Sequence, residues 1–182
     1  SGAADPGRNL DRLKLRDASA RFAAVLDADA PGVFVPTLDR AARSANFRDA
    51  ELIADLCAAV VAGGLAAREI GIVTPYRAQG RALRNALHST LGAQAVRDVV
   101  ADTVERMQGQ ERELIILSLA TGVRAFLEQV ASFFFQPERL NVSITRAKTK
   151  LIVIGPWIDS PPEVEHPVLR RWIGEYVDLQ RS

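Results

Sequence analysis

Ile70-Gly71-Ile72-Val73-Thr74, closed by Pro75, is the stretch that decides the fold, because it begins with a continuous apolar run. A strand that faces solvent on one side alternates apolar and polar residues, whereas a strand covered on both sides is apolar throughout. Further aliphatic runs occupy Leu114–Leu119 and Leu151–Gly155. The sequence therefore predicts several strands that are buried on both faces.

Helical patterns alternate with these runs. Asn46 is a suitable N-cap, apolar residues follow it at helical spacing through Val61, and Gly63-Gly64 ends the pattern. Four other elements are expected from their apolar spacing: a strand at 33–35, a helix at 76–91, a strand at 96–101 and a helix from residue 167 onward. Alternating strands and helices require right-handed crossovers, so the expected fold class is α/β, with a mostly parallel sheet covered by helices.

The composition is that of an ordinary globular protein. With 182 residues, of which 48% are hydrophobic and 25% charged, the chain is expected to form one folded unit. Residues 1–30 lack a sustained apolar stripe and are expected to be poorly structured or loosely packed, whereas residues 31–182 form the domain. The net charge of +1 predicts no partner by itself. Because no window is apolar enough to span a membrane and no secretory signal opens the chain, we expect a cytoplasmic protein.

The chain offers little material for a disulfide or a metal site. Cys57 is the one cysteine, so it cannot form an internal disulfide, and its apolar neighbours at helical spacing indicate core packing. The two histidines, His88 and His166, are far apart in the sequence, and no second cysteine joins them. We therefore expect no metal site.

Three polar segments flank the apolar runs. Residues 74–79 follow the first run directly, residues 102–111 form a polar loop between two predicted strands, and residues 139–148 lie immediately before the last run. Ligands of parallel α/β sheets gather outside the carboxyl ends of the strands. These flanks are therefore where we look for functional residues.

The same segments resemble the motifs of a known family. Ile-Val-Thr-Pro-Tyr-Arg-Ala-Gln at 72–79 resembles motif IV of superfamily 1 helicases of the nonsense-mediated-decay type. Asp-Thr-Val through Met-Gln-Gly-Gln-Glu at 102–111 resembles motif V, and Arg-Leu-Asn-Val-Ser-Ile-Thr-Arg-Ala-Lys at 139–148 resembles motif VI. Their order and spacing agree as well. The resemblance implies a three-layer RecA-like domain, the second of the two lobes between which these enzymes hold ATP.

The parts that would hold the triphosphate do not occur in this sequence. It has no Gly-x-x-x-x-Gly-Lys-Ser/Thr loop and no strand that ends in an Asp-Glu pair. The resemblance implies that a first RecA-like lobe supplies them, so ATP and Mg²⁺ would be bound mainly there. We therefore expect a P-loop NTPase-like domain that lacks its own P-loop, and a chain that does not hydrolyse ATP alone.

The resemblance assigns nucleotide roles to several residues. Arg146 matches the motif VI arginine, whose planar guanidinium suits the charge that develops on the γ-phosphate; a surface arginine at a helix end is the alternative. Glu111 matches the motif V acid near the nucleotide, with a solvated flank as its alternative. The other nucleotide-binding candidates are Gln79, Gln108 and Gly109, of which the glycine would allow close approach of a ligand.

The resemblance also implies a track for single-stranded DNA or RNA. Thr74, Pro75 and Thr103 are the candidates, because short donors at strand ends suit phosphate oxygens. The alternative is that both threonines only end strands and satisfy local backbone groups. One position departs from the family: several relatives have a phosphate-binding arginine right after the motif IV glutamine, where this chain has Gly80. That second arginine contact is therefore in question.

Two rival functions stand beside an ATP-dependent helicase. The chain could be a non-catalytic nucleic-acid-binding or scaffold lobe of a degenerate helicase, against which the presence of Arg146 and Glu111 counts. An unrelated nucleotide-binding α/β domain has no support, because no glycine-rich fingerprint follows the first strand. The sequence does not distinguish DNA from RNA or give a direction of movement.

Overall fold

One parallel sheet organises the molecule. The computed structural model describes residues 20–27, 29–103, 107, 110–123, 147–159, 163 and 167–182. The strands are β1 (Gly32–Pro36), β2 (Ile70–Val73), β3 (Val100–Asp102), β4 (Arg112–Ser118) and β5 (Ala147–Gly155). They lie in the order β1-β5-β4-β2-β3, and each neighbouring pair is parallel. The predicted α/β class with a parallel sheet is confirmed.

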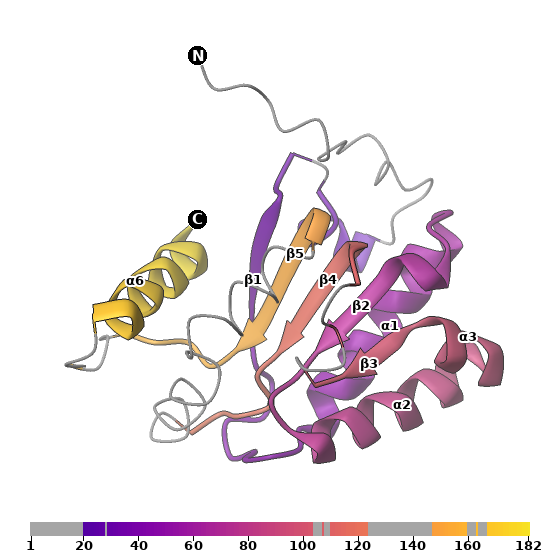
Figure 1. Ribbon diagram of the computed structural model, residues 1–182, viewed down its shortest axis with the longest axis horizontal. Coiled ribbons are helices and arrows are strands. Elements are labelled where there is room, and N and C mark those ends of the chain that lie inside the picture. Colours follow the sequence, from indigo (N-terminus) through magenta and orange to yellow (C-terminus); the bar gives the residue numbers. More distant parts are fainter. Residues whose placement is uncertain are drawn as a thin grey trace.

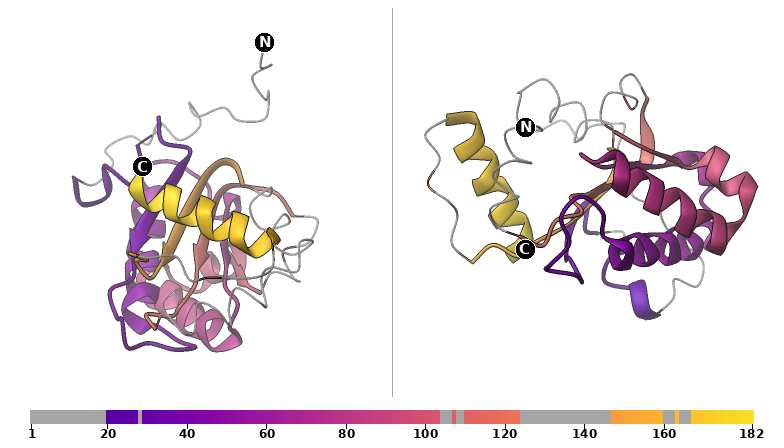
Figure 2. Two further views of the ribbon diagram at one scale, coloured as in Figure 1. Left: turned by 90° about the vertical axis from the view of Figure 1, so that its left-hand side faces the viewer. Right: turned by 90° about the horizontal axis from the view of Figure 1, so that it is seen from below.

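Helices cover both faces of this sheet. On one face lie α1 (Phe47–Ala62), α2 (Arg77–Leu91) and α3 (Ala93–Asp98), and on the other lies α6 (Pro167–Arg181), as Figures 1 and 2 show. Two short 3₁₀ turns, η2 (Ala20–Phe22) and η3 (Ala67–Glu69), complete the described elements. Among the described residues, no helix is both long and apolar enough to cross a membrane.

The sheet separates two apolar cores. Alternate residues of a strand point to opposite faces, and in β4 Ile116 packs with the α1 and α2 side while Ile115 packs with the α6 side. The register aligns Ile116 with Ile72 of β2 and with Ile152 of β5, so one row of isoleucines crosses the centre of the sheet. This two-sided burial is the physical reason for the continuous apolar runs.

The predicted elements agree with the structure except at two places: the strand expected at 96–101, and the start of β5, which lies at Ala147 and not at the predicted Leu151. Asn46 caps α1 as expected, since its side chain accepts a hydrogen bond from the Asp49 amide. The strand predicted at 96–101 is wrong over its first half: residues 93–98 form α3, and the strand begins only at Val100. Gly92, with a φ of +84°, ends α2 and starts α3 at once, a conformation that glycine adopts without strain.

A buried lysine ties the segment before β1 to the sheet. Lys150 of β5 is 1% exposed, and its ammonium donates to the carbonyls of Asp27 (2.7 Å) and Ala30 (2.6 Å). Loss of hydration lowers the pKa of Lys150. Phe22 and Leu26 are also buried in the core on the α1 side. The domain boundary at residue 30 stays a prediction, because residues 1–19 lie outside the described part of the chain.

A buried hydrogen-bond network joins the strand ends to the helix starts. The backbone amide of Asn46 donates to Gln79 Oε1 (2.7 Å), and Gln79 Nε2 donates to Ser118 Oγ at the end of β4 (3.1 Å). Asn46 Nδ2 donates to Thr37 Oγ1 (2.8 Å), whose hydroxyl donates to Asp49. All five side chains are buried, so each hydrogen bond replaces one to water that burial removed. We call these five residues the polar network.

Gly155 lies where α6 packs closely against the end of β5, and a larger residue there has no space. A Cβ at this position would lie 2.5 Å from Tyr176 Oη and 2.7 Å from Leu119 Cδ1. The Tyr176 hydroxyl is held by its hydrogen bond to the Pro156 carbonyl (2.8 Å), so it cannot move aside freely. We expect Gly155→Ala to lower the free energy of unfolding, measured in urea, by about 1–3 kcal/mol.

A matched control for this change is Gly174→Ala on the exposed side of α6, where an added Cβ meets nothing within 4 Å. Replacing a glycine inside a helix should raise stability, by up to about 1 kcal/mol. Equal stability of Gly155→Ala and the parent protein would contradict the packing of α6 described above.

Asp49 makes the stability of the polar network depend on pH. Burial raises the pKa of its carboxyl above the ordinary 3.8, although the Leu38 amide and the Thr37 hydroxyl donate to it and oppose the shift. The folded protein therefore takes up this proton at a higher pH than the unfolded chain does. Stability from this group must increase as pH falls from above the folded-state pKa toward 3.8.

The comparison of the parent protein with Asp49→Asn isolates this contribution, because an amide does not titrate. Urea unfolding between pH 7 and pH 4 should show the parent gaining stability relative to the variant as the pH falls. A constant difference, or a difference that changes in the other direction, would show that the Asp49 pKa is not raised.

Candidate functional site

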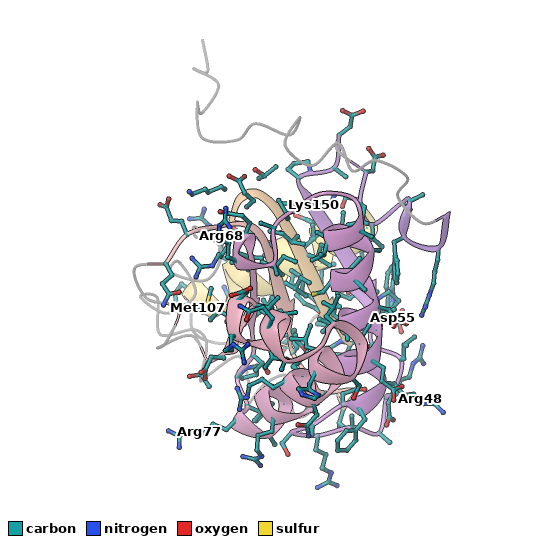
Figure 3. The ribbon with its side chains drawn as sticks, turned by 90° about the vertical axis from the view of Figure 1, so that its right-hand side faces the viewer. Arg48, Asp55, Arg68, Arg77, Met107 and Lys150 are labelled. Atoms are coloured by element: carbon teal, nitrogen blue, oxygen red, sulfur yellow. The ribbon has the colours of Figure 1, made fainter. Side chains whose placement is uncertain are left out.

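The predicted site residues fall at two opposite ends of the sheet. Thr74 and Thr103 follow β2 and β3 at their carboxyl ends, whereas Glu111 directly precedes β4 at its amino end. Seven residues of β4 separate the two ends, which is roughly 20 Å of extended chain. Figure 3 shows the same division, with Lys150 near one end of the sheet and Arg77 near the other. The two threonines therefore lie at the carboxyl ends of strands, where ligands of parallel sheets gather, whereas Glu111 lies at the opposite end of the sheet.

Thr74 and Pro75 form a buried turn between β2 and α2. The Thr74 amide donates to the Asp102 carbonyl (3.2 Å), which extends the pairing with β3 by one residue. The Thr74 hydroxyl accepts a hydrogen bond from the Tyr76 amide (3.4 Å), and the residue is fully buried. These contacts satisfy local backbone groups. A contact of Thr74 or Pro75 with nucleic acid stays a prediction.

Gln79 is fully buried within the polar network. Its carbonyl oxygen accepts from the Asn46 amide, and its amide nitrogen donates to Ser118 Oγ and, at 3.4 Å, to the Asn46 carbonyl. Both ends of the side chain are therefore occupied by the protein itself. The arrangement fixes the start of α2 against β4 and α1, and the predicted contact of Gln79 with a nucleotide is untested.

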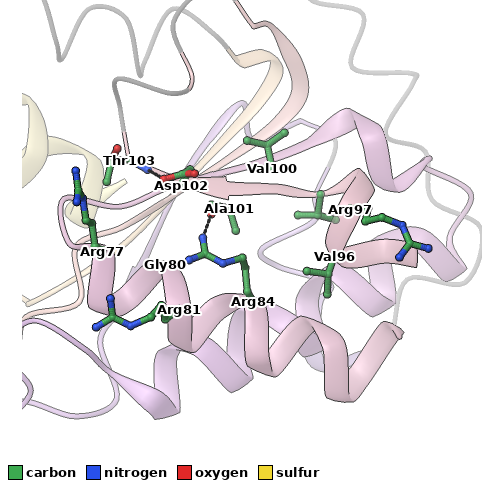
Figure 4. A pocket seen from close by; sticks show the side chains of 11 residues that line it. Arg77, Gly80, Arg81, Arg84, Val96, Arg97, Val100, Ala101, Asp102 and Thr103 are labelled. Atoms are coloured by element: carbon green, nitrogen blue, oxygen red, sulfur yellow. Dashed lines mark hydrogen bonds between the residues drawn. The ribbon is translucent and has the colours of Figure 1, made fainter. Parts of the chain in front are cut away.

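Thr103 borders a pocket of about 500 Å³ between α2, α3 and β3. Its amide donates to the Asp102 carboxylate (2.8 Å), as Figure 4 shows. Four arginines line the same pocket: Arg77, Arg81, Arg84 and Arg97. A partly exposed threonine at a strand end beside several guanidinium groups is a suitable environment for phosphate oxygens.

Arg84 occupies the space above Gly80, the position that departs from the helicase pattern. A Cβ at Gly80 would lie 3.4 Å from Arg84 Nη1, and that nitrogen donates to the Ala101 carbonyl of β3 (2.9 Å). Arg84 comes four positions after Gly80, so the two residues lie one above the other on α2. Position 80 itself has no arginine side chain, but the guanidinium of Arg84 reaches it from the next helical turn.

At the other end of the sheet, Glu111 lies beside β5. Arg112 pairs with Ala147 in the register of β4 and β5, so Glu111 and Arg146 each directly precede a member of this pair. Lys148 Nζ lies 4.0 Å from Glu111 Oε2, and both side chains are well exposed, so this ion pair adds little stability. Arg146, Gln108 and Gly109 lie outside the described residues, and their predicted nucleotide roles are untested.

The loop between β3 and β4 is anchored by residues that the sequence analysis did not single out. Met107 is fully buried, and its Cε fills the space that a Cβ at Gly71 would occupy, 2.7 Å away. Arg112 donates to the Glu111 carbonyl (2.9 Å) and to Gln110 Oε1 (2.7 Å). Gly71 was the feature of the sequence that could have indicated this contact, because a glycine inside an apolar strand is typical of a place where another group approaches closely.

Comparison with known proteins agrees with this geometry. A family model described as an AAA domain matches residues 8–157. The human DNA replication ATP-dependent helicase/nuclease DNA2 is 33% identical over 122 residues, which are 66% of this chain and 11% of that protein. The DNA polymerase alpha-associated DNA helicase A of Schizosaccharomyces pombe is 36% identical over 110 residues, 60% of this chain and 16% of that protein.

A third relative is the Regulator of nonsense transcripts 1 homolog of Neurospora crassa, which is 36% identical over 94 residues, 50% of this chain and 8% of that protein. The chain thus spans less than a fifth of the length of each of these helicases and helicase-related proteins. The family model nevertheless matches well over half of the chain. The chain therefore belongs to the AAA-domain family of superfamily 1 helicases.

Proposed function

We propose that this chain is the second motor lobe of an ATP-dependent helicase or translocase that moves on single-stranded DNA or RNA. The observation that supports it best is the pairing of Arg112 with Ala147 at the starts of β4 and β5, because in the sequence Glu111 comes directly before Arg112 and Arg146 directly before Ala147. An acid and an arginine that both come from this end of the sheet would suit a nucleotide that a first RecA-like lobe presents. That lobe would hold most of the ATP and its Mg²⁺.

Each nucleotide-facing residue has a distinct task in this proposal. Arg146 is the arginine finger, which neutralises charge on the γ-phosphate oxygens as the bond to the leaving phosphate breaks. Glu111 accepts a hydrogen bond from the nucleotide or orients the attacking water. Gln108 and Gly109 let the loop approach the nucleotide closely, with Met107 as the buried anchor beside them.

The carboxyl end of the sheet serves the nucleic acid in this proposal. Thr103 donates its hydroxyl to a backbone phosphate, and Thr74 with Pro75 shapes the turn beside it. Gln79, whose amide is used within the polar network, contributes by holding this turn and α2 in place. ATP binding at one end of the sheet and strand binding at the other would then share the loop between β3 and β4.

Arg146→Ala tests the enzyme role in the protein that contains both lobes. Removal of an arginine finger should lower nucleic-acid-stimulated ATP hydrolysis by about a thousandfold or more. The control is Arg181→Ala, which removes the same charge from the exposed end of α6 and should leave the rate unchanged. A normal rate in Arg146→Ala would remove this residue from the mechanism and favour the scaffold function.

Thr103→Val tests the strand track, because valine keeps the shape of threonine and removes its hydroxyl. Loss of one hydrogen bond to phosphate is worth about 1 kcal/mol, so the affinity for a fluorescein-labelled oligothymidylate should fall about fivefold in fluorescence anisotropy. Thr90→Val, on the exposed end of α2, is the matched control. Equal affinities of both variants would exclude a hydroxyl contact at Thr103.

A further inference from the structure

The pocket beside β3 concentrates positive charge. Arg77, Arg81 and Arg84 reach it from successive positions on one side of α2, and Arg97 reaches it from α3. Figure 4 shows these side chains with the edge strand β3 behind them. Asp102 is the single carboxylate among the residues that line the pocket. Four guanidinium groups against one carboxylate make this the feature of the described surface that most needs an explanation.

Helix stability does not explain the arginines. Arg77 is the first residue of α2, where the helix dipole disfavours a positive side chain, and Arg81 lies one turn further along the helix. They are also four residues apart, a spacing at which like charges repel each other by a few tenths of a kcal/mol. The α2 sequence contains no aspartate or glutamate that could offset this repulsion. The arrangement costs stability, as functional sites often do.

Internal pairing does not explain them either. Within the part of the chain that the structure describes, neither Arg77 nor Arg81 has a hydrogen-bond or ion-pair partner, and both are exposed. Arg84 commits Nη1 to the Ala101 carbonyl, a bond that holds the side chain over Gly80. Arg97 is tied to Gln94 of its own helix (2.6 Å). Most of the donor capacity of Arg77, Arg81 and Arg84 thus stays available to a ligand.

We propose that this pocket binds phosphate groups, with Arg77, Arg81 and Arg84 as the contacting residues. A guanidinium matches two phosphate oxygens at once, and seven residues of helix spread these three arginines over roughly 10 Å, enough for two or more linked phosphates. Thr103 continues the row at the carboxyl end of β3. The inference rests on the proposed function, because a helicase lobe meets two ligands that contain linked phosphates: a nucleic-acid strand and a nucleoside triphosphate.

The test compares two phosphate probes on the full chain. Fluorescein-labelled dT12, followed by fluorescence anisotropy, represents the strand, and inorganic triphosphate, followed by calorimetry, represents the nucleotide phosphates. The variants are Arg81→Gln, Arg84→Gln and the double variant, and Arg181→Gln on α6 is the control of equal charge. Urea unfolding verifies that each variant is folded. If Arg84→Gln does not fold, the comparison uses Arg81→Gln alone, because Arg81 is exposed and its replacement should not disturb the fold.

We expect the double variant to lose about tenfold or more in affinity for at least one probe, with no loss in Arg181→Gln. For dT12, the slope of log affinity against log salt should also become shallower by about 1.4, since each phosphate contact contributes about 0.7. A loss confined to dT12 identifies the strand as the source of the phosphates, and a loss confined to triphosphate identifies the nucleotide.

Two results would overturn the inference: unchanged affinity of the double variant for both probes, or an equal loss in Arg181→Gln, which would reduce the effect to net charge. Neither of these binding results depends on the rate of ATP hydrolysis measured for Arg146→Ala. Failure of the phosphate pocket and failure of the proposed motor function are therefore separate outcomes.

Discussion

Burial of the central strands on both faces is the constraint on which the rest of this structure depends. β2, β4 and β5 lie between two apolar cores, so aliphatic side chains dominate their middle positions. Polar side chains inside such a sheet need a partner, and Glu113, Thr149 and Lys150 each have one in the protein. Within the described sheet, this leaves the strand ends and the two edge strands, β1 and β3, as the places where side chains can meet a ligand.

The polar network shows how the carboxyl end of the sheet is kept in order. It connects the end of β1, the end of β4 and the starts of α1 and α2 by hydrogen bonds between buried groups. A buried group that loses its partner costs more than the hydrogen bond contributes, so the network defines one arrangement of these elements. The turn that carries Thr74 and the first arginines of α2 takes its position from that arrangement.

The elements that could be predicted from the sequence are those whose burial leaves a regular pattern. The runs at β2, β4 and β5 are apolar because both faces are covered, and Asn46 is an N-cap for a local reason. The strand expected at 96–101 was partly wrong because its β-branched residues favour a strand, whereas the turn at Gly92 starts a short helix that continues through Asp98.

The beginning of β5 was missed for the opposite reason. Its Ala-Lys-Thr-Lys sequence is polar, and only contacts with distant residues, such as the Asp27 and Ala30 carbonyls, make it a strand that can be buried. The candidate site divides in the same way. The motifs indicate which segments resemble those of helicases, but periodicity and spacing do not state at which end of a parallel strand a flanking segment lies. Glu111 therefore proved to be far from Thr74.

The loop from β3 to β4 has a particular place in the proposed motor. It leaves the carboxyl end of β3 at Thr103 and returns to the amino end of β4 at Glu111, and Met107 fastens its middle to the sheet in the space beside Gly71. A packed side chain has few alternative positions, so displacement at one end of this loop is opposed or transmitted at Met107. Under the proposed function, nucleotide contacts and strand contacts lie on opposite sides of that anchor. A coupling free energy between the two ligands would require an element whose position both of them influence, and Met107 is the buried residue of this loop that could serve as that element.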